Sequence, residues 1–383
     1  MDFYNKNNAL GLAQNIDISL NDSFNTNIFS ISDDLQNMFD CFLLPNIKRN
    51  LGSFIFFDKN NALYDLFSKQ KDSFGYKINK FSLNETFNIF SNLTSEDEIQ
   101  KFVKSVLRNC TEIQRYLYEG KTEIDLLYTQ TDLILTLILI YLQKNIPFKE
   151  RSFSYINKVI NKLNNNNLDY FKKIFGKIES SYKIQSSIFH LDYMTENEYK
   201  KSLSILIDIL SNTTDTTTKE TTIIDSINNL YQTKQPELFF IELTDIAVID
   251  SFFCSYTEEY CYKNNLSKQS YPIIYVYAPL EKIGYVPNLH KLIENKEKNN
   301  DVHILSFNSI PTAIKLYGKD IRVIMDEIPY GLLLQTQKEK NINLIQKLLS
   351  NTCISNLITK ILSDPTSLIL YKKPDNISIQ KKL

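Results

Sequence analysis

The chain has 383 residues, of which 43% are hydrophobic and 23% charged, and its formal net charge at pH 7 is −1. That length is enough for two or three subdomains around a large buried core, and the balance of residue types is typical of a soluble globular protein. Lysines and acids are interspersed along the chain, which disfavours strong autonomous binding of nucleic acid, since that normally needs a basic excess or a basic stripe.

The N-terminal part predicts a short βαβ unit. The first twenty residues show no charged leader followed by an apolar core, so we expect no signal peptide. "NIFSIS" (27–32) and "GSFIFFD" (52–58) are typical of buried strands, a helix is expected over 62–71, and "YKINKFSL" alternates like a third strand. Strand, helix and strand in this order favour a parallel sheet.

The middle of the chain predicts helices. Ser95 with Glu98 three residues later is typical of a capping box, and helical periodicity continues to about Leu210. The segment 132–144 has an uncharged core of about ten residues, shorter than the ~20 needed to span a bilayer, so it predicts a buried helix and no transmembrane segment. The polar stretch 211–222 predicts an exposed linker.

Strands and helices alternate again after the linker. "ELFFIEL", "PIIYVYA", "DVHILSF" and "YGLLLQT" predict strands with helices between them. The chain is therefore expected to be an α/β core split by an all-helical insertion, with domains at 1–94, 95–222 and 223–383. The strand in "PIIYVYA" ends in Ala278 and Pro279, where a nucleotide-hydrolysing protein usually carries acids that hold magnesium.

Two short motifs imitate nucleotide-binding signatures. "EGKTE" contains Gly120, Lys121 and Thr122, the end of a phosphate-binding loop, but Arg115 stands where that loop needs its first glycine. "RVIMDEIP" carries Asp326 and Glu327 after an apolar run, which imitates a magnesium-binding strand end. We interpret it as a short helix that ends before Pro329, and the strand-end interpretation stays open as the weaker alternative.

The histidines and cysteines nominate no catalytic or metal site. The three histidines lie far apart without metal-binding spacing, and a histidine such as His303 inside a strand is more often a core residue than a catalyst. None of the five cysteines forms a CxxC pair, which is typical of reduced thiols in a cytosolic protein. These residues are His190, His290 and His303, and Cys41, Cys110, Cys254, Cys261 and Cys353.

Several stretches resemble the TraG-type coupling proteins of conjugative type IV secretion. "LLPNIKRNLGSFIFFDKNNALYDLF" is similar to the family's Pro-Asn-Leu, strand and Asp-Pro-Lys-Gly-Glu-Leu-Tyr turn, in which Asp58, Leu63 and Tyr64 keep their places. "TQTDLILTLILIYLQKNIPFKERSFSYINKVI" resembles the family's all-α domain. "YPIIYVYAPLEKIGYVPNLHKLI", with Gly284, and "VHILSFNSIPTAIKLYGKD" resemble its Walker B region and the strand and helix after it. The resemblance implies an α/β fold, namely a RecA-like P-loop NTPase core with a mostly parallel sheet, interrupted by an all-α insertion domain.

The departures from the family pattern fall on its chemistry. Counting back from Pro45, the family's phosphate loop would lie over "SDDLQNMF", and none of the loop's glycines, its lysine or its hydroxyl residue is present there. These vestigial positions are Ser32, Leu35 and Asn37 for the glycines, Met38 for the lysine and Phe39 for the hydroxyl. The stretch also gains Asp33 and Asp34, which would repel phosphate. The Walker B acids would lie at Ala278 and Pro279, neither of which can hold magnesium or activate a nucleophile. Asn308 stands where the family often has a glutamine that senses the nucleotide.

The resemblance and its departures together predict a non-catalytic relative, a pseudo-ATPase that acts as a binding or scaffold subunit in conjugative DNA transfer. Its expected partners are proteins of the secretion apparatus, such as an active coupling ATPase or a relaxase. No cofactor is expected. Oligomerisation and recruitment to the inner face of the membrane stay open for a cytoplasmic protein. One alternative is an active ATPase or DNA translocase with an atypical site that uses ATP and Mg²⁺. The other is a nucleotide-independent DNA-binding protein, which the charge does not support.

Overall fold

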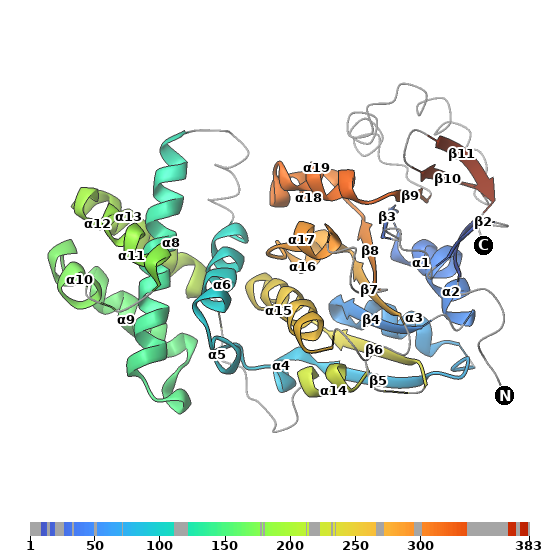
Figure 1. Ribbon diagram of the computed structural model, residues 1–383, viewed down its shortest axis with the longest axis horizontal. Helices are drawn as coiled ribbons and strands as arrows, with labels where there is room; N and C mark the ends of the chain where they lie inside the picture. Colours follow the sequence, from blue (N-terminus) through green and yellow to red (C-terminus); the bar gives the residue numbers. More distant parts are fainter. Residues whose placement is uncertain are drawn as a thin grey trace.

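A β-sheet on one side and a group of helices on the other make up the chain (Figure 1). The computed structural model describes residues 9–13, 16–19, 27–32, 34–49, 52–70, 72–110, 122–176, 178, 181–211, 213, 223–230, 233, 235–265, 272–294, 301–334, 367–372 and 376–381. The expected linker and the segment with Gly120 and Lys121 therefore lie largely or wholly outside the described residues.

Nine of the described strands form one sheet in the order β11-β10-β9-β3-β8-β7-β4-β6-β5, and β1 (Ala9–Ala13) and β2 (Ile16–Ser19) form a separate two-stranded sheet. The seven strands from β9 to β5 pair in parallel, and β10 and β11 are antiparallel. The sheet strands are β3 (Ile28–Ile31), β4 (Ser53–Asp58), β5 (Lys77–Ser82), β6 (Glu237–Glu242), β7 (Ile273–Ala278), β8 (Val302–Phe307), β9 (Tyr330–Leu333), β10 (Ser367–Lys372) and β11 (Asn376–Lys381).

Helices cover both faces of the parallel strands (Figure 1). One face carries α1 (Leu35–Met38), the π-helical turn η1 (Phe39–Leu43), α2 (Leu44–Lys48) and α3 (Ala62–Ser68). The other carries α15 (Ala247–Asn265), α16 (Leu280–Ile283), α17 (Leu289–Glu294), α18 (Ile310–Tyr317) and α19 (Asp320–Glu327). Because strand side chains alternate between faces, Phe54 and Phe56 join the core on the first side, and Ile55 and Phe57 join the core on the second.

The strands expected from apolar runs are confirmed, as is the parallel sheet. The first βαβ unit, however, does not place its two strands side by side. β6 lies between β4 and β5 and pairs with both. The strand that fills the gap begins only at Glu237, after the whole helical part of the chain, which local patterns do not reveal.

The helical part is built around one long helix, α8 (Thr122–Asn145), which is the long upright blue-green helix in Figure 1. The helices around it are α6 (Glu96–Arg108), α9 (Phe153–Asn164), α10 (Leu168–Phe175), α11 (Tyr182–Ile188), α12 (His190–Tyr193) and α13 (Glu196–Leu210). The remaining short elements are η2 (Lys59–Asn61), α4 (Leu83–Thr86), α5 (Ile89–Asn92), η3 (Phe148–Glu150) and α14 (Ile223–Leu230). The capping box expected at Ser95 and Glu98 is confirmed.

Within the described residues, the segment 126–145 of α8 is long and apolar enough to cross a membrane, and 67% of the most apolar window is buried inside the protein. Ile134, Leu135 and Leu137 are each fully buried there. An apolar helix that is buried on most sides is typical of a packed core helix. The expected buried helix is therefore confirmed.

Helix α6 joins the helical part to the sheet. Its Phe102 packs edge-on against Phe252 of α15 with ring centroids 5.5 Å apart, and its Lys101 pairs with Glu259 of α15. At the end of α6, Arg108 donates to the Asp320 carboxylate at 2.9 Å and to the Tyr317 carbonyl at 3.1 Å. One continuous core therefore runs from the sheet through α15 and α6 into the helices.

Candidate functional site

The edge between β3 and β8 is where the topology favours a ligand site. In parallel sheets covered on both faces, ligands bind beyond the carboxyl ends of the strands, where successive connections run in opposite directions. The chain leaves β3 for β4 on one side and leaves β8 for β9 on the other. The predicted phosphate-loop positions follow β3 and Asn308 follows β8, so both lie at this point.

The turn after β3 closes on itself. Asp34 is the N-cap of α1, and its Oδ1 accepts a hydrogen bond from the Gln36 amide at 3.0 Å. The Ser32 hydroxyl donates to the Asp34 carbonyl at 2.7 Å, and the Ser32 amide donates to the Phe307 carbonyl at 3.0 Å. Asp33, the other acid of this turn, lies outside the described residues. A phosphate loop needs free amides at the start of its helix, whereas here a carboxylate of the chain already occupies one.

The predicted lysine and hydroxyl positions lie in the core instead of at the edge. Met38 and Phe39 are 0% and 1% exposed, and they pack with Phe42 and Phe54 on one face of the sheet. The predicted glycine positions Leu35 and Asn37 are helical and half-buried. Only three residues separate the end of β3 from the start of α1, which is short for a loop that wraps around an anion.

The end of β7 carries no acid, yet an acid lies three residues further on. Ala278 is 1% exposed, and Pro279 is the N-cap of α16. The Glu281 Oε1 accepts from the amides of Asn308 at 2.8 Å and Ser309 at 2.7 Å, which ties α16 to the start of α18. Burial raises the pKa of Glu281, and these hydrogen bonds offset part of that shift. The carboxylate is engaged in holding two connections together.

Asp58, at the end of β4, caps a helix. It is fully buried and accepts from the amides of Leu63 at 2.9 Å and Tyr64 at 2.8 Å, at the start of α3. Burial raises the pKa of Asp58 to about 6, against the lowering effect of these two hydrogen bonds. Asp58 and Tyr64, which match the family pattern, are therefore joined by a hydrogen bond from the Tyr64 amide to the Asp58 carboxylate, and this bond fixes the start of α3.

Asp250 holds the connection after β6 in place through hydrogen bonds and an ion pair. Its Oδ1 accepts from the Thr244 amide and the Thr244 hydroxyl, both at 2.7 Å, and its Oδ2 pairs with Lys59 at 3.0 Å. Burial raises the pKa of Asp250 to about 6, while Lys59 acts in the opposite direction. Lys59 also donates to the Thr244 carbonyl, so this cation is held by the protein itself.

Four carboxylates thus hold backbone amides of the connections at this edge: Asp34, Asp58, Asp250 and Glu281. An incoming phosphate is recognised mainly by such amides, and it is repelled by carboxylates close to them. Of these four carboxylates, Asp34 is the one that follows β3, so it is the one that bears on the predicted phosphate-loop positions.

Gly284 links this edge to the helical part. Its φ of 108° is unfavourable for other residues, and a Cβ built on it would lie 2.5 Å from the Asn109 Oδ1. That oxygen accepts from the Tyr285 amide at 2.8 Å, and the Tyr285 ring lies under the Arg108 guanidinium, 4.4 Å from its centroid. Gly284 therefore allows the end of α6 to dock beside the end of β7.

Asp326 and Glu327 do not lie on a strand end. They form the last turn of α19, and the Asp326 side chain is 60% exposed and faces Arg322. The interpretation of these acids as a magnesium-binding strand end is wrong, and the short helix ending before Pro329 is confirmed. The apolar residues Ile321, Ile324 and Met325 follow helical spacing, which is the physical reason for the helix.

The histidines are scattered, as their spacing indicates. His190 is exposed on α12, and His290 is half-buried on α17. His303 is buried in β8, where its Nε2 lies 2.9 Å from the Glu258 Oε2 and its ring stacks on Tyr275. His303 is therefore a hydrogen-bonded core residue. Among the described residues there is no group of three or more His, Cys, Asp or Glu side chains that could hold a metal ion.

Sequence reasoning missed Glu281, Asp250 and Asn109. Glu281 lies in the same stretch as Ala278 but beyond the strand end, where a pattern search for acids does not look. Asp250 and Asn109 bond with partners on other elements, Lys59 and Tyr285. The sequence carries no local signal for such contacts.

Solved structures with this fold are known. An unbound form of the bacterial conjugative coupling protein TrwB has a TM-score of 0.61, with 10% identity over 99% of this chain and 89% of that chain. TrwB in complex with the non-hydrolysable ATP analogue ADPNP gives 0.60 at 10% identity, over 94% and 86%. VirB4 of Thermoanaerobacter pseudethanolicus gives 0.50 at 11% identity, over 99% and 97%. No protein-family model and no curated protein matches the sequence. The chain thus has the RecA-like fold of these proteins.

Two of the TrwB structures contain a bound nucleotide. One TrwB structure holds ADPNP, and another holds ADP and Mg²⁺. Mg²⁺ takes oxygen ligands, and phosphates take amides and a cation. At the corresponding edge this chain has Ala278 at the end of β7, and Met38 and Phe39 buried beneath the turn after β3.

Proposed function

We propose that this chain is a non-catalytic relative of the conjugative coupling proteins and serves as a binding or scaffold subunit in conjugative DNA transfer or type IV secretion. The likeness to TrwB over nearly the whole chain supports the setting. The single observation that carries the loss of catalysis is the turn after β3, where Asp34 takes a helix amide that a phosphate would need. Its partners in this proposal are an active coupling ATPase, a relaxase or other proteins of the apparatus.

A scaffold role agrees with how the edge is built. Carboxylates that cap connections from within fix those connections without any ligand, so the two faces of the sheet keep one arrangement whether or not ATP is present. An ATPase instead needs connections that change when nucleotide is bound and hydrolysed. The Arg108 and Asn109 contacts extend the same fixed arrangement to the helical part.

Thermal unfolding with and without ATP and Mg²⁺ tests the proposal. A site with nucleotide at a hundredfold excess over its Kd would gain about 2.7 kcal/mol, which for a chain of this length raises the Tm by about 3 °C. We expect no shift and no release of inorganic phosphate above the buffer control, with an active coupling ATPase as positive control. A shift of that size that saturates with ATP would overturn the proposal.

A further inference from the structure

Both ring nitrogens of the buried His303 face oxygen acceptors. The Nε2 lies 2.9 Å from the Glu258 Oε2 on α15, and the Nδ1 lies 3.1 Å from the Oδ1 of Asn27, the residue before β3. Two backbone groups fix the orientation of the Asn27 amide group, because its Oδ1 accepts from the His303 amide at 2.8 Å and its Nδ2 donates to the Ile293 carbonyl at 3.2 Å. A neutral imidazole has only one N–H, so only a doubly protonated ring donates to both oxygens.

The Glu258 carboxylate depends on this contact with the ring. Glu258 is 4% exposed, and among the described residues its other oxygen, Oε1, has no hydrogen-bond partner. A buried carboxylate without a cation or a donor is costly, so Glu258 and His303 stabilise each other's charged form. Burial lowers the pKa of His303 and the Glu258 carboxylate raises it, and the net direction is upward.

The other titratable groups around the pair come from β7, β8, α15 and α6. Asp301, just before β8, is a second carboxylate that favours the protonated ring. Tyr275 of β7 stacks on the imidazole with ring centroids 5.4 Å apart. Glu259, the next residue on α15, pairs with Lys101 of α6. Among the described residues no lysine or arginine forms an ion pair with Glu258, so the imidazolium is its cation.

We propose that His303, Glu258 and Asn27 form a pH-sensitive switch at the edge where the parallel strands begin. In its closed state the protonated ring holds the starts of β8 and β3 to α15. When the ring loses the Nε2 proton to solvent, Nε2 becomes an acceptor that faces the carboxylate, and the contact between β8 and α15 opens. The next residue of α15 carries the ion pair with Lys101, so opening also loosens the turn on which α6 is docked. The switch lies at the opposite edge from the predicted phosphate-loop positions and does not depend on the proposed scaffold function.

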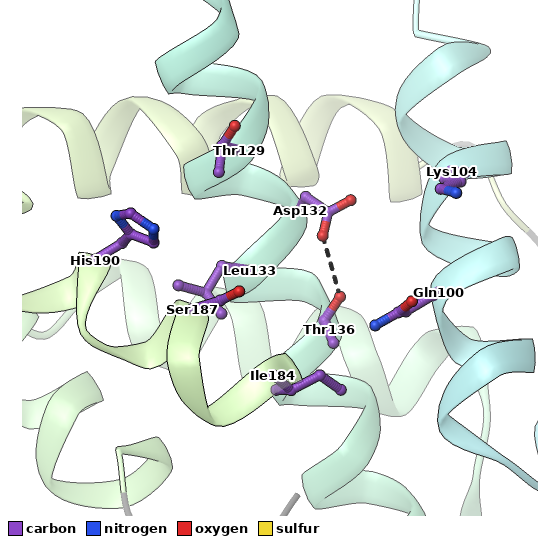
Figure 2. Close-up of a pocket in the computed structure, with 9 residues that line it drawn as sticks. All are labelled: Gln100, Lys104, Thr129, Asp132, Leu133, Thr136, Ile184, Ser187 and His190. Carbon is purple, nitrogen blue, oxygen red and sulfur yellow. Dashed lines mark hydrogen bonds between the residues drawn. The ribbon is translucent and has the colours of Figure 1, made fainter. Parts of the chain in front are cut away.

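An NMR titration of the histidine rings in the full chain tests the protonation state. The His303 ring should be doubly protonated at pH 6 and should lose its proton with a midpoint above about 6.5, the usual pKa of histidine. His190 supplies the signal of an exposed ring in the same spectra, since it lies on the wall of the groove in Figure 2 and has no hydrogen bond to the other residues drawn there. Glu258→Gln should move the His303 midpoint below about 6.5, because burial then acts without the carboxylate. The matched control Glu259→Gln, at the neighbouring acid, should move it much less.

Hydrogen exchange of single backbone amides tests whether the proton controls the structure. The His303 amide is bonded to the Asn27 side chain and reports on the switch, and the amide of Leu305, in the middle of the same strand, is the internal control. From one pH unit below the midpoint of the ring to one above it, the protection of the His303 amide, corrected for the intrinsic pH dependence of exchange, should fall about tenfold or more. That of Leu305 should stay constant.

Three results overturn the inference. They are a His303 ring that is neutral at pH 6, a ring that stays protonated up to the pH at which the chain unfolds, and a His303 amide that is equally protected on both sides of the midpoint. The wild-type titration and the exchange measurement need no substitution, so a variant that fails to fold leaves both tests in force.

Discussion

Replacing Glu281 by alanine should destabilise the protein strongly, because its carboxylate is the acceptor for two backbone amides. The Glu281 Oε1 takes the amides of Asn308 and Ser309 at 2.8 and 2.7 Å. A partly buried amide left without an acceptor costs about 1–3 kcal/mol, so leaving both amides without one predicts about 2–6 kcal/mol for Glu281→Ala. Glu281→Gln keeps an acceptor oxygen for both amides. It also removes a carboxylate whose pKa is raised by burial, so the substitution should cost less than about 1 kcal/mol.

Urea unfolding followed by circular dichroism at pH 7 measures both values, with the slope checked for constancy. Glu242→Ala provides a comparison at an acid that stands at the end of β6 on the same edge. The reasoning is refuted if Glu281→Ala changes the free energy of unfolding by less than about 0.5 kcal/mol, or if the glutamine variant is as unstable as the alanine variant.

Further predictions concern the link to the helical part and the buried histidine. A double-mutant cycle of Arg108→Ala and Asp320→Asn should give a coupling of about 1 kcal/mol, because the pair is bonded at 2.9 Å and Asp320 is partly exposed; additive effects would contradict this. Gly284→Ala should cost about 2–4 kcal/mol and less in an Asn109→Ala background, since the new Cβ meets the Asn109 side chain; equal costs in both backgrounds would argue against that contact. Burial alone lowers the pKa of His303, but the Glu258 carboxylate raises it and the net direction is upward. Its ion pair therefore stabilises the fold below the unfolded pKa of about 6.5, and this stabilisation is lost as the pH rises through the folded value. The cost of His303→Gln, measured by urea unfolding, should thus be larger at pH 6 than at pH 9, and a cost independent of pH would contradict the assignment.

The sequence predicts most of the strands because each one is a local run of apolar residues. Runs such as "SFIFFD" and "VHILSF" are apolar on both faces, which is typical of strands buried in a parallel sheet. The order of the strands is less accessible, since β6 enters between β4 and β5 from a distant part of the chain. Non-local pairing leaves no trace in either partner alone.

The sequence predicts which nucleotide-binding residues are missing from the candidate site. It does not predict which side chains hold the site together instead. The missing residue types can be read directly from the sequence: Met38 stands at the predicted lysine position, and Ala278 stands at a predicted acid position. The replacements bond across the structure, as Glu281 does with the start of α18, and their geometry follows only from the folded edge. Asp326 shows the converse, because an acid after an apolar run imitates a strand end until the helical spacing of that run is taken into account.

Isothermal titration of the full chain with ATP and Mg²⁺ tests the central claim most directly. The account predicts no binding heat beyond dilution, because Asp34 holds a helix amide in the turn after β3 and Met38, buried in the core, stands where the phosphate loop would have its lysine. A saturable isotherm with one nucleotide per chain and a Kd in the low micromolar range would contradict it.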